Sequence, residues 1–171
     1  MNLDDLPPAE VMWEGKFVRV LRRDRWEYAS RSRDIRAVVV LAEHEGQVIL
    51  VEQPRVPTGC RCVELPAGLV GDQDPDATVE DTAIKELEEE TGFTAERIER
   101  LGDFYASPGM LAEGFTLVRA HGVRRIGEGG GDEHEDIVVH LVPRSGIPNF
   151  IEQKRAEGLG ADAKMLLLLN Y

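Results

Sequence analysis

The stretch Lys85-Glu86-Leu87-Glu88-Glu89-Glu90-Thr91-Gly92-Phe93 is the most informative segment of this 171-residue chain. On a helix, Glu86, Glu89 and Glu90 follow an i, i+3, i+4 spacing and project from one face, while Glu88 points elsewhere. Three carboxylates on one face repel one another, unless a hard cation such as Mg²⁺ lies between them. An isolated cluster of this kind is more often a solvated acidic surface, so a cation site can be inferred only with support from other segments of the chain.

Working outward, the pattern predicts a helix from about 76 to 91, with Asp74 and Pro75 at its start and Gly92 at its end. Two nearly continuous apolar runs, 35–42 and 47–53, predict buried strands joined as a hairpin. Strands interleaved with few helices favour one α/β (α+β) domain, a mixed β-sheet covered by helices on each side. Further strands are expected at 16–22, 25–30, 61–65, 98–106, 114–121 and 135–142, and short helices at 148–157 and 161–169.

Composition excludes several classes of function. The chain carries 20 basic and 32 acidic side chains, a net charge of −12, which argues against nucleic acid as a partner. The N-terminus lacks a basic segment followed by an apolar one, and no apolar run is long enough for a membrane span. Cys60 and Cys62 make neither a disulfide framework nor a good zinc site. We therefore expect a cytoplasmic protein that meets an anionic substrate through a divalent cation.

The segment 85–93 resembles the second half of the Nudix box, Arg-Glu-U-x-Glu-Glu-x-Gly-U with U apolar. Gly68 fits the opening glycine, Asp74 stands where a glutamate is usual, three extra residues follow, and Lys85 replaces the arginine. The resemblance to the Nudix hydrolase superfamily implies a Nudix-type αβα sandwich with a catalytic loop-helix-loop. It assigns residues 35–171 to the Nudix domain and leaves the N-terminal strands, 1–34, for a homodimer interface.

Three further segments are similar to the ADP-ribose pyrophosphatase subfamily: 51–55 with 64–68, 105–113, and the C-terminal 160–169. By that resemblance Arg55 contacts a substrate phosphate and Glu64 lies near the terminal ribose or the metal. Pro108 falls sixteen residues after Gly92, where ADP-ribose enzymes carry a proline. The same loop contributes Ser107 and places Glu113 beside the substrate ribose. Trp26, favoured slightly over Trp13, stacks on adenine.

The resemblance also implies two or three Mg²⁺ ions, for which Mn²⁺ can substitute. Their ligands would be the carboxylates of Glu86, Glu89, Glu90 and Glu135 and the carbonyl of Ala67. A glycine-rich loop, 127–132, is expected to be mobile and to swing the catalytic base into place. Glu133 is the expected base, with Glu135 and Asp136 as open alternatives.

The expected reaction is the magnesium-dependent hydrolysis of ADP-ribose to AMP and ribose 5-phosphate. A sister activity on a nucleotide sugar, GDP-mannose or UDP-glucose, is the first alternative, and the loop with Pro108 argues against it. A non-catalytic Nudix domain that senses nucleotides is the second alternative. The intact Glu86, Glu89 and Glu90 argue against that one, while Lys85 and the lengthened box keep it open.

Overall fold

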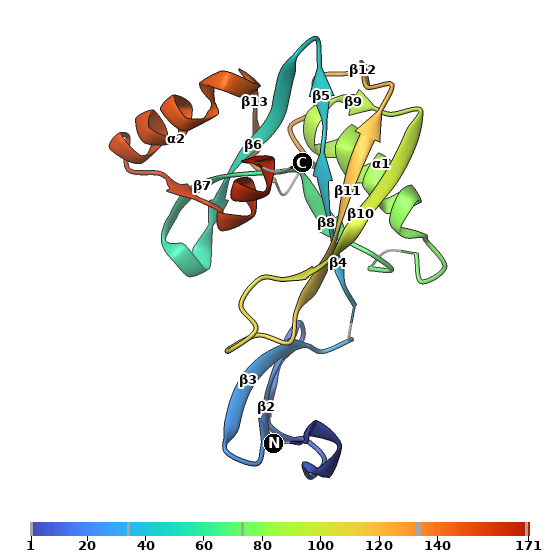
Figure 1. Cartoon of the computed structure of the whole chain (residues 1–171), viewed down its shortest axis with the longest axis vertical. Helices are drawn as coiled ribbons and strands as arrows, with labels where there is room; N and C mark the ends of the chain where they lie inside the picture. The colour runs from blue at the N-terminus through green and yellow to red at the C-terminus, as the bar shows by residue number, and fades with distance from the viewer. Residues whose placement is uncertain (1, 34, 73, 133–134, 170) are drawn as a thin grey trace.

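The computed structural model describes residues 2–33, 35–72, 74–132, 135–169 and 171. Two main sheets and their helices form the body, and a three-stranded sheet projects from one end of it (Figure 1). The projecting sheet follows the 3₁₀ turn η1 (Leu3–Asp5) and contains β1 (Glu10–Glu14), β2 (Val18–Arg23) and β3 (Trp26–Arg31). The structure therefore adds β1 to the two N-terminal strands that the sequence predicts.

Both main sheets are mixed. In the first, β11 and β4 are parallel and the other pairs antiparallel, in the order β10 (Arg97–Tyr105), β11 (Gly114–His121), β4 (Ala37–Leu41), β8 (Ala67–Leu69). The second has the order β13 (Val138–Pro143), β6 (Gln47–Arg55), β7 (Cys60–Glu64), β14 (Gly160–Ala161), with β7 and β14 parallel. Short pairs add β5 (Glu43–His44) to β6, and β9 (Phe93–Thr94) to β12 (Arg124–Arg125).

The prediction that the two apolar strands pair along their length as a hairpin is wrong. Only β5 pairs with the start of β6, around a turn in which Glu45 and Gly46 have φ of 50° and 76°. Beyond that turn β4 and β6 diverge into different sheets. Both strands are apolar on both faces, and a two-stranded hairpin could not cover all four of those faces.

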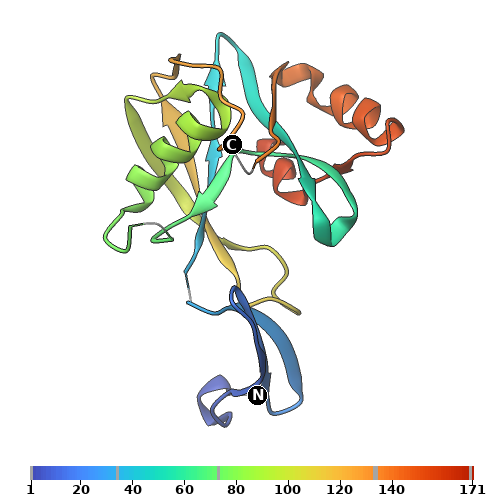
Figure 2. The ribbon, with the colours of Figure 1, turned by 180° about the vertical axis from the view of Figure 1, so that it is seen from behind.

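Two clusters of buried side chains fill the body. One lies between the sheets, where Val39 and Leu50 pack together and Met165 from η4 (Ala163–Leu169) closes the layer. The other lies between the first sheet and α1 (Val79–Thr91), around Val40 and Leu87. α1 and α2 (Ile147–Ala156) flank the sheets from opposite sides, as Figures 1 and 2 show. The expected fold class, a mixed sheet arrangement with helices on both sides, is confirmed.

α1 begins later than the sequence suggests. The Asp74 carboxylate accepts from the amide of Asp76 at 3.0 Å and closes a local turn instead of capping the helix. Thr78 is the N-cap: its hydroxyl accepts from the amide of Asp81 at 3.1 Å, and the Asp81 carboxylate accepts from the amide of Thr78 at 3.3 Å. This reciprocal pair is a capping box. The helix ends at Gly92 in the left-handed conformation (φ 73°), as expected.

The C-terminal segment is a 3₁₀ helix instead of the expected α-helix over 161–169. The Asp162 carboxylate accepts from the amide of Lys164 at 2.7 Å, and the amide of Met165 bonds to the Asp162 carbonyl, an i, i+3 pattern. Two further 3₁₀ turns are η2 (Val56–Thr58) and η3 (Arg144–Gly146). Among the described residues no helix is long and apolar enough to cross a bilayer.

Candidate active site

α1 lies against β8, the short strand that precedes it (Figure 2), and Glu86 on its acidic face meets Gly68. A Cβ placed on Gly68 would lie 2.1 Å from Cδ of Glu86, so only glycine leaves room for this carboxylate. One turn further, the Glu90 carboxylate accepts from the backbone amide of Ala67 at 3.1 Å. Glu86 and Glu90 therefore lie side by side along the edge formed by Ala67 and Gly68.

The carboxylate of Glu90 has little access to water, with 3% of the residue exposed. Burial raises its pKa to about 8, and the nearby charges of Glu86 and Glu135 act in the same direction. The amide of Ala67 and the charge of Arg55 oppose this rise without cancelling it. Burial also raises the pKa of Glu86, again with Glu135 contributing. At neutral pH the raised pKa therefore favours the neutral form of Glu90 in the absence of a cation, and a cation bound beside it would favour the ionised form.

Glu89 occupies the rim of this cluster. Lys85 donates to its carboxylate at 2.6 Å across one helical turn, and both side chains are about half exposed. The hydrogen bond with Glu89 raises the pKa of Lys85. The lysine therefore draws Glu89 toward the solvent side of the helix, away from the buried pair.

Arg55 and Glu64 form a second part of the site at the β6–β7 hairpin. Nε and Nη2 of Arg55 donate to the two oxygens of Glu64 at 2.7 and 2.8 Å, a bidentate pair. Glu64 is buried, and the charge of Glu90 helps to raise the pKa of Arg55 after the larger effect of Glu64. The guanidinium thus lies at the border of the α1 carboxylates.

The glycine-rich loop is docked on the end of α1, and the mobility expected for it stays a prediction. The amides of Gly130 and Gly131 donate to the carbonyls of Glu90 and Glu89 at 2.9 and 3.0 Å. A Cβ on Gly129 would lie 2.3 Å from the carbonyl carbon of Thr91. In this structure the glycines serve close approach of two backbones, and they satisfy carbonyls that a helix end leaves without partners.

Beyond the glycines, Glu135 lies over Gly131 and affects the pKa of both Glu86 and Glu90. The structure thereby brings this predicted ligand to the α1 carboxylates. Asp136 is turned the other way, toward Arg61, with which it pairs at 2.6 Å. Glu133, the expected base, lies outside the described residues.

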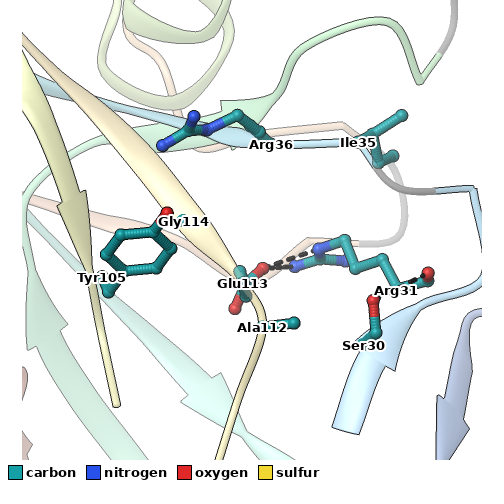
Figure 3. Close-up of a pocket in the computed structure, with 8 residues that line it drawn as sticks. All are labelled: Ser30, Arg31, Ile35, Arg36, Tyr105, Ala112, Glu113 and Gly114. Carbon is teal, nitrogen blue, oxygen red and sulfur yellow. Dashed lines mark hydrogen bonds and ion pairs between the residues drawn. The ribbon is translucent and has the colours of Figure 1, made fainter. Parts of the chain in front are cut away.

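Glu113 lines a separate pocket at the junction between the projecting sheet and the body (Figure 3). Arg31, at the end of β3, donates to its carboxylate at 2.6 Å. Arg36 and Tyr105 line the opposite wall (Figure 3). Strand pairing places Leu117 of β11 level with Ala67, and Glu113 lies four residues before Leu117, an offset of about 13 Å along the strand direction. The full lining is Ser30, Arg31, Ile35, Arg36, Tyr105, Ala112, Glu113 and Gly114.

Sequence reasoning missed Arg31, Arg36 and Tyr105. The signal available was the cluster of arginines between 31 and 36, just before the first buried strand of the body. These three positive charges indicate a pocket only once the strand order is known, because the pocket forms where β3 and β11 meet.

The remaining predicted residues fall on both sides of this junction. Ser107 starts a turn in which its carbonyl accepts from the amides of Met110 and Leu111 at 3.0 and 2.8 Å, and Pro108 is exposed. The loop is fixed to the projecting sheet by hydrogen bonds between Ala29 and residues 110 and 112. Trp26 begins β3 and is 44% exposed, five residues from the pocket residue Arg31. It does not line the pocket within one chain.

The family model of the NUDIX domain matches residues 31–157. This chain belongs to the Nudix family. The match covers α1, the first main sheet and all of the second except β14, and the expectation of a Nudix hydrolase is confirmed. A solved structure described as an ADP compounds hydrolase has the same fold, with a TM-score of 0.71 and 20% identity over 96% of this chain and 90% of that one.

Several curated relatives resemble this Nudix chain over different lengths. The ADP-ribose pyrophosphatase of Bacillus subtilis is 47% identical over 79 residues, 45% of this chain and 40% of that protein. The methanol dehydrogenase activator of Bacillus methanolicus is 35% identical over 79% of this chain and 70% of its own length. The GDP-mannose pyrophosphatase of Citrobacter koseri is 33% identical over 89% of this chain and 78% of its own length. The resemblance to ADP-ribose pyrophosphatases expected from the sequence is confirmed.

The donor set of the Nudix box fits a hard divalent cation. In the described part of the chain no basic side chain is hydrogen-bonded to Glu86 or Glu90, and hard cations prefer such carboxylate oxygens as ligands. Among the described residues no group of three or more His, Cys, Asp or Glu side chains is placed to hold a metal ion by itself. Mg²⁺ does not require one, because it keeps several waters and substrate phosphates as ligands. The three extra residues of the box lie in the turn before Thr78 and leave these carboxylates in place.

Proposed function

We propose that this Nudix enzyme hydrolyses the pyrophosphate of ADP-ribose, giving AMP and ribose 5-phosphate, with Mg²⁺ as its cofactor and Mn²⁺ as a substitute. The main support is the pair of carboxylates, Glu86 and Glu90, held against Gly68 and Ala67 beside Arg55. The identity to an ADP-ribose pyrophosphatase over 79 residues supports the choice of substrate.

In this proposal Glu86, Glu90, Glu135 and the carbonyl of Ala67 hold the cations, and Glu89 joins them by leaving Lys85. When bound, the cations neutralise pyrophosphate charge and lower the pKa of a water molecule. Glu133 accepts the proton of that water as the general base. Glu86 and Glu90 already lie beside each other and need no rearrangement to bind a cation, which lowers the entropic cost of assembling the site.

Arg55 and Glu64 serve the substrate at the edge of the metal cluster. A guanidinium can present two parallel donors to a phosphate, as it does to the carboxylate of Glu64. Because Glu64 occupies Nε and one hydrogen of Nη2, the edge formed by Nη1 and Nη2 would meet the phosphate. Glu64 would hold that edge in a fixed orientation and would itself lie near the terminal ribose. Replacing Arg55 by lysine would keep the charge and lose the fork.

The junction pocket is proposed to receive the nucleoside end. Glu113 accepts hydrogen bonds from ribose hydroxyls, since an ionised carboxylate is an acceptor only. Ser107 and Pro108 fix the loop that carries it. Arg31, already bonded to Glu113, keeps this carboxylate oriented toward the pocket.

A homodimer would complete this pocket. The projecting sheet exposes large apolar side chains, with Trp13 58%, Phe17 65% and Trp26 44% exposed. Exposed apolar patches of this kind mark interaction surfaces. A partner subunit seated on this sheet would bury them, and its Trp26 could then reach an adenine ring. Size-exclusion chromatography with light scattering should give twice the chain mass.

A nucleotide sugar is the second candidate substrate. GDP-mannose pyrophosphatases match up to 89% of this chain, a longer stretch than the ADP-ribose pyrophosphatase match. The metal cluster and Arg55 would act alike on either compound, because both contain a pyrophosphate. A domain that only binds the nucleotide is the third candidate, favoured by the pairing of Glu89 with Lys85.

The deciding experiment measures phosphate release, coupled to alkaline phosphatase, from ADP-ribose, GDP-mannose, UDP-glucose and NADH. It is run with and without Mg²⁺, beside Glu90→Gln. We expect ADP-ribose to be the best substrate, Mg²⁺ to be essential, and Glu90→Gln to lose at least about a hundredfold in rate. A preference for a sugar nucleotide would change the assigned substrate and leave the proposed metal-dependent hydrolysis of a pyrophosphate unchanged. Tight binding with no turnover of any compound would overturn the proposal of an active hydrolase.

A further inference from the structure

Arg61 makes an unusual set of contacts across the second sheet. From β7 its guanidinium passes β6 and reaches Asp136, two residues before β13 begins. Nε donates to the Glu52 carboxylate at 2.8 Å and Nη1 to the Asp136 carboxylate at 2.6 Å. Nη2 donates to two main-chain carbonyls, of Glu52 at 3.2 Å and of Asp136 at 3.0 Å. The side chain therefore fixes the backbone at Asp136 as well as its carboxylate.

The Glu52 carboxylate that binds the Arg61 guanidinium is itself fixed by other groups. The Glu52 carboxylate is buried and accepts two further hydrogen bonds, from His140 and from Lys154, both at 3.0 Å. Lys154 comes from α2 and His140 from β13, so three elements converge on one carboxylate. With Glu52 so constrained, Arg61 has few alternative positions.

The other end of the segment is held by α1. The amides of Gly130 and Gly131 bond to the last carbonyls of that helix, as described above. Glu135 lies between this anchor and Asp136, and its side chain approaches Gly131 and the charges of Glu86 and Glu90. Adjacent residues thus point to opposite sides, Asp136 to Arg61 and Glu135 to α1.

We propose that Arg61 is a positioning residue that fixes Glu135 beside Glu86 and Glu90. This inference rests on the proposed function, in which Glu135 shares a cation with those carboxylates. Arg61 contacts neither the substrate nor the cation in this account, and acts through the backbone of Asp136. An arginine is required because its planar fork reaches four acceptors at once, which a lysine cannot do.

The test compares Arg61→Gln, Arg61→Lys and Asp136→Ala with wild type. The matched control is Arg100→Gln, which breaks another bidentate arginine–carboxylate pair, with Glu80 in the first turn of α1. Three quantities are measured: amide hydrogen exchange in the metal-free protein, Mn²⁺ affinity by electron paramagnetic resonance, and kcat and KM. Asp136 has a 74% exposed side chain, so its truncation leaves the fold intact even if Arg61→Gln does not fold.

We expect faster exchange of the Ile137 amide, which bonds to the Gly130 carbonyl, in all three variants. Mn²⁺ affinity and kcat should each fall by about tenfold, the usual scale for groups that orient metal ligands, with KM unchanged. Arg61→Lys should resemble Arg61→Gln, and Arg100→Gln should match wild type.

Two results would overturn the inference. Unchanged exchange would show that Arg61 does not anchor the segment. Faster exchange with unchanged Mn²⁺ affinity and kcat would leave Arg61 a merely structural residue. If wild type binds Mn²⁺ but hydrolyses none of the compounds, only the proposed function is overturned. The Mn²⁺ affinities of the variants then still test the role of Arg61. A wild type that binds no Mn²⁺ overturns the inference as well.

Discussion

At the scale of single residues, Gly68 decides whether the metal cluster can assemble. The Cβ of Gly68→Ala would fall 2.1 Å from Cδ of Glu86, and a flexible carboxylate can move away more easily than the backbone. We therefore expect the fold to survive and the concentration of Mg²⁺ that gives half-maximal activity to rise by about tenfold. An Mg²⁺ titration of the reaction rate measures this, with thermal unfolding of both proteins as the check on folding.

Gly146→Ala is the matched control for Gly68→Ala. A Cβ at Gly146 would meet its neighbours at 3.8 and 3.9 Å, ordinary contact distances, and this glycine precedes α2 far from the cluster. Its Mg²⁺ dependence should equal that of wild type. If Gly68→Ala also left the Mg²⁺ concentration for half-maximal activity unchanged, the position of Glu86 against Gly68 would not matter for Mg²⁺ binding.

At the scale of elements, the N-terminus of α1 depends on Thr78. Thr78→Ala removes the hydroxyl that accepts from the Asp81 amide, and should lower the free energy of unfolding by about 1 kcal/mol. Asp74→Ala, at the residue that the sequence suggested as the cap, should change it by less than about 0.5 kcal/mol. Urea unfolding of the two variants distinguishes the assignments, and the opposite ranking would restore Asp74 as the cap.

At the scale of the whole molecule, the network around Glu52 joins β6, β7, β13 and α2. Burial favours the neutral form of Glu52, yet hydrogen bonds from Lys154, Arg61 and His140 outweigh it and lower its pKa from 4.5 to about 2. The unfolded chain therefore binds this proton more readily than the folded protein does. The stabilising effect is complete above pH 4.5 and is lost as the pH falls toward 2.

The measurement is the free energy of unfolding in urea at pH 7, 4 and 3, for wild type and Glu52→Gln. The difference between the two proteins should shrink as the pH falls, because protonation removes from wild type what the substitution removes at every pH. The comparison cancels the other titrating groups. A difference that stays constant down to pH 3 would contradict the lowered pKa of Glu52.

Local patterns in the sequence were sufficient where a structure depends on nearby residues. The helix was expected from about 76 to 91 and extends over 79–91. Its glycine end and the shared face of Glu86 and Glu90 follow from spacing alone, because side chains three and four apart on a helix are neighbours. The strands 97–105 and 114–121 were expected within one residue of their observed ends, since apolar residues and turn residues bound them. The start of the helix was assigned to Asp74, and the structure corrects this assignment to Thr78.

Other features required the tertiary structure, because they join residues far apart in the chain. Spacing cannot say that β4 and β6 enter different sheets, that Arg31 meets Glu113, or that Arg61 reaches Asp136. Spacing also did not show that the glycines of residues 127–132 allow close approach to α1, and the mobility expected of this loop stays a prediction. The sequence determined which carboxylates share a helix face and hence the family chemistry. Only the tertiary structure decided which backbone and basic groups surround them, since those contacts form between strands and loops brought together by the packing of the core.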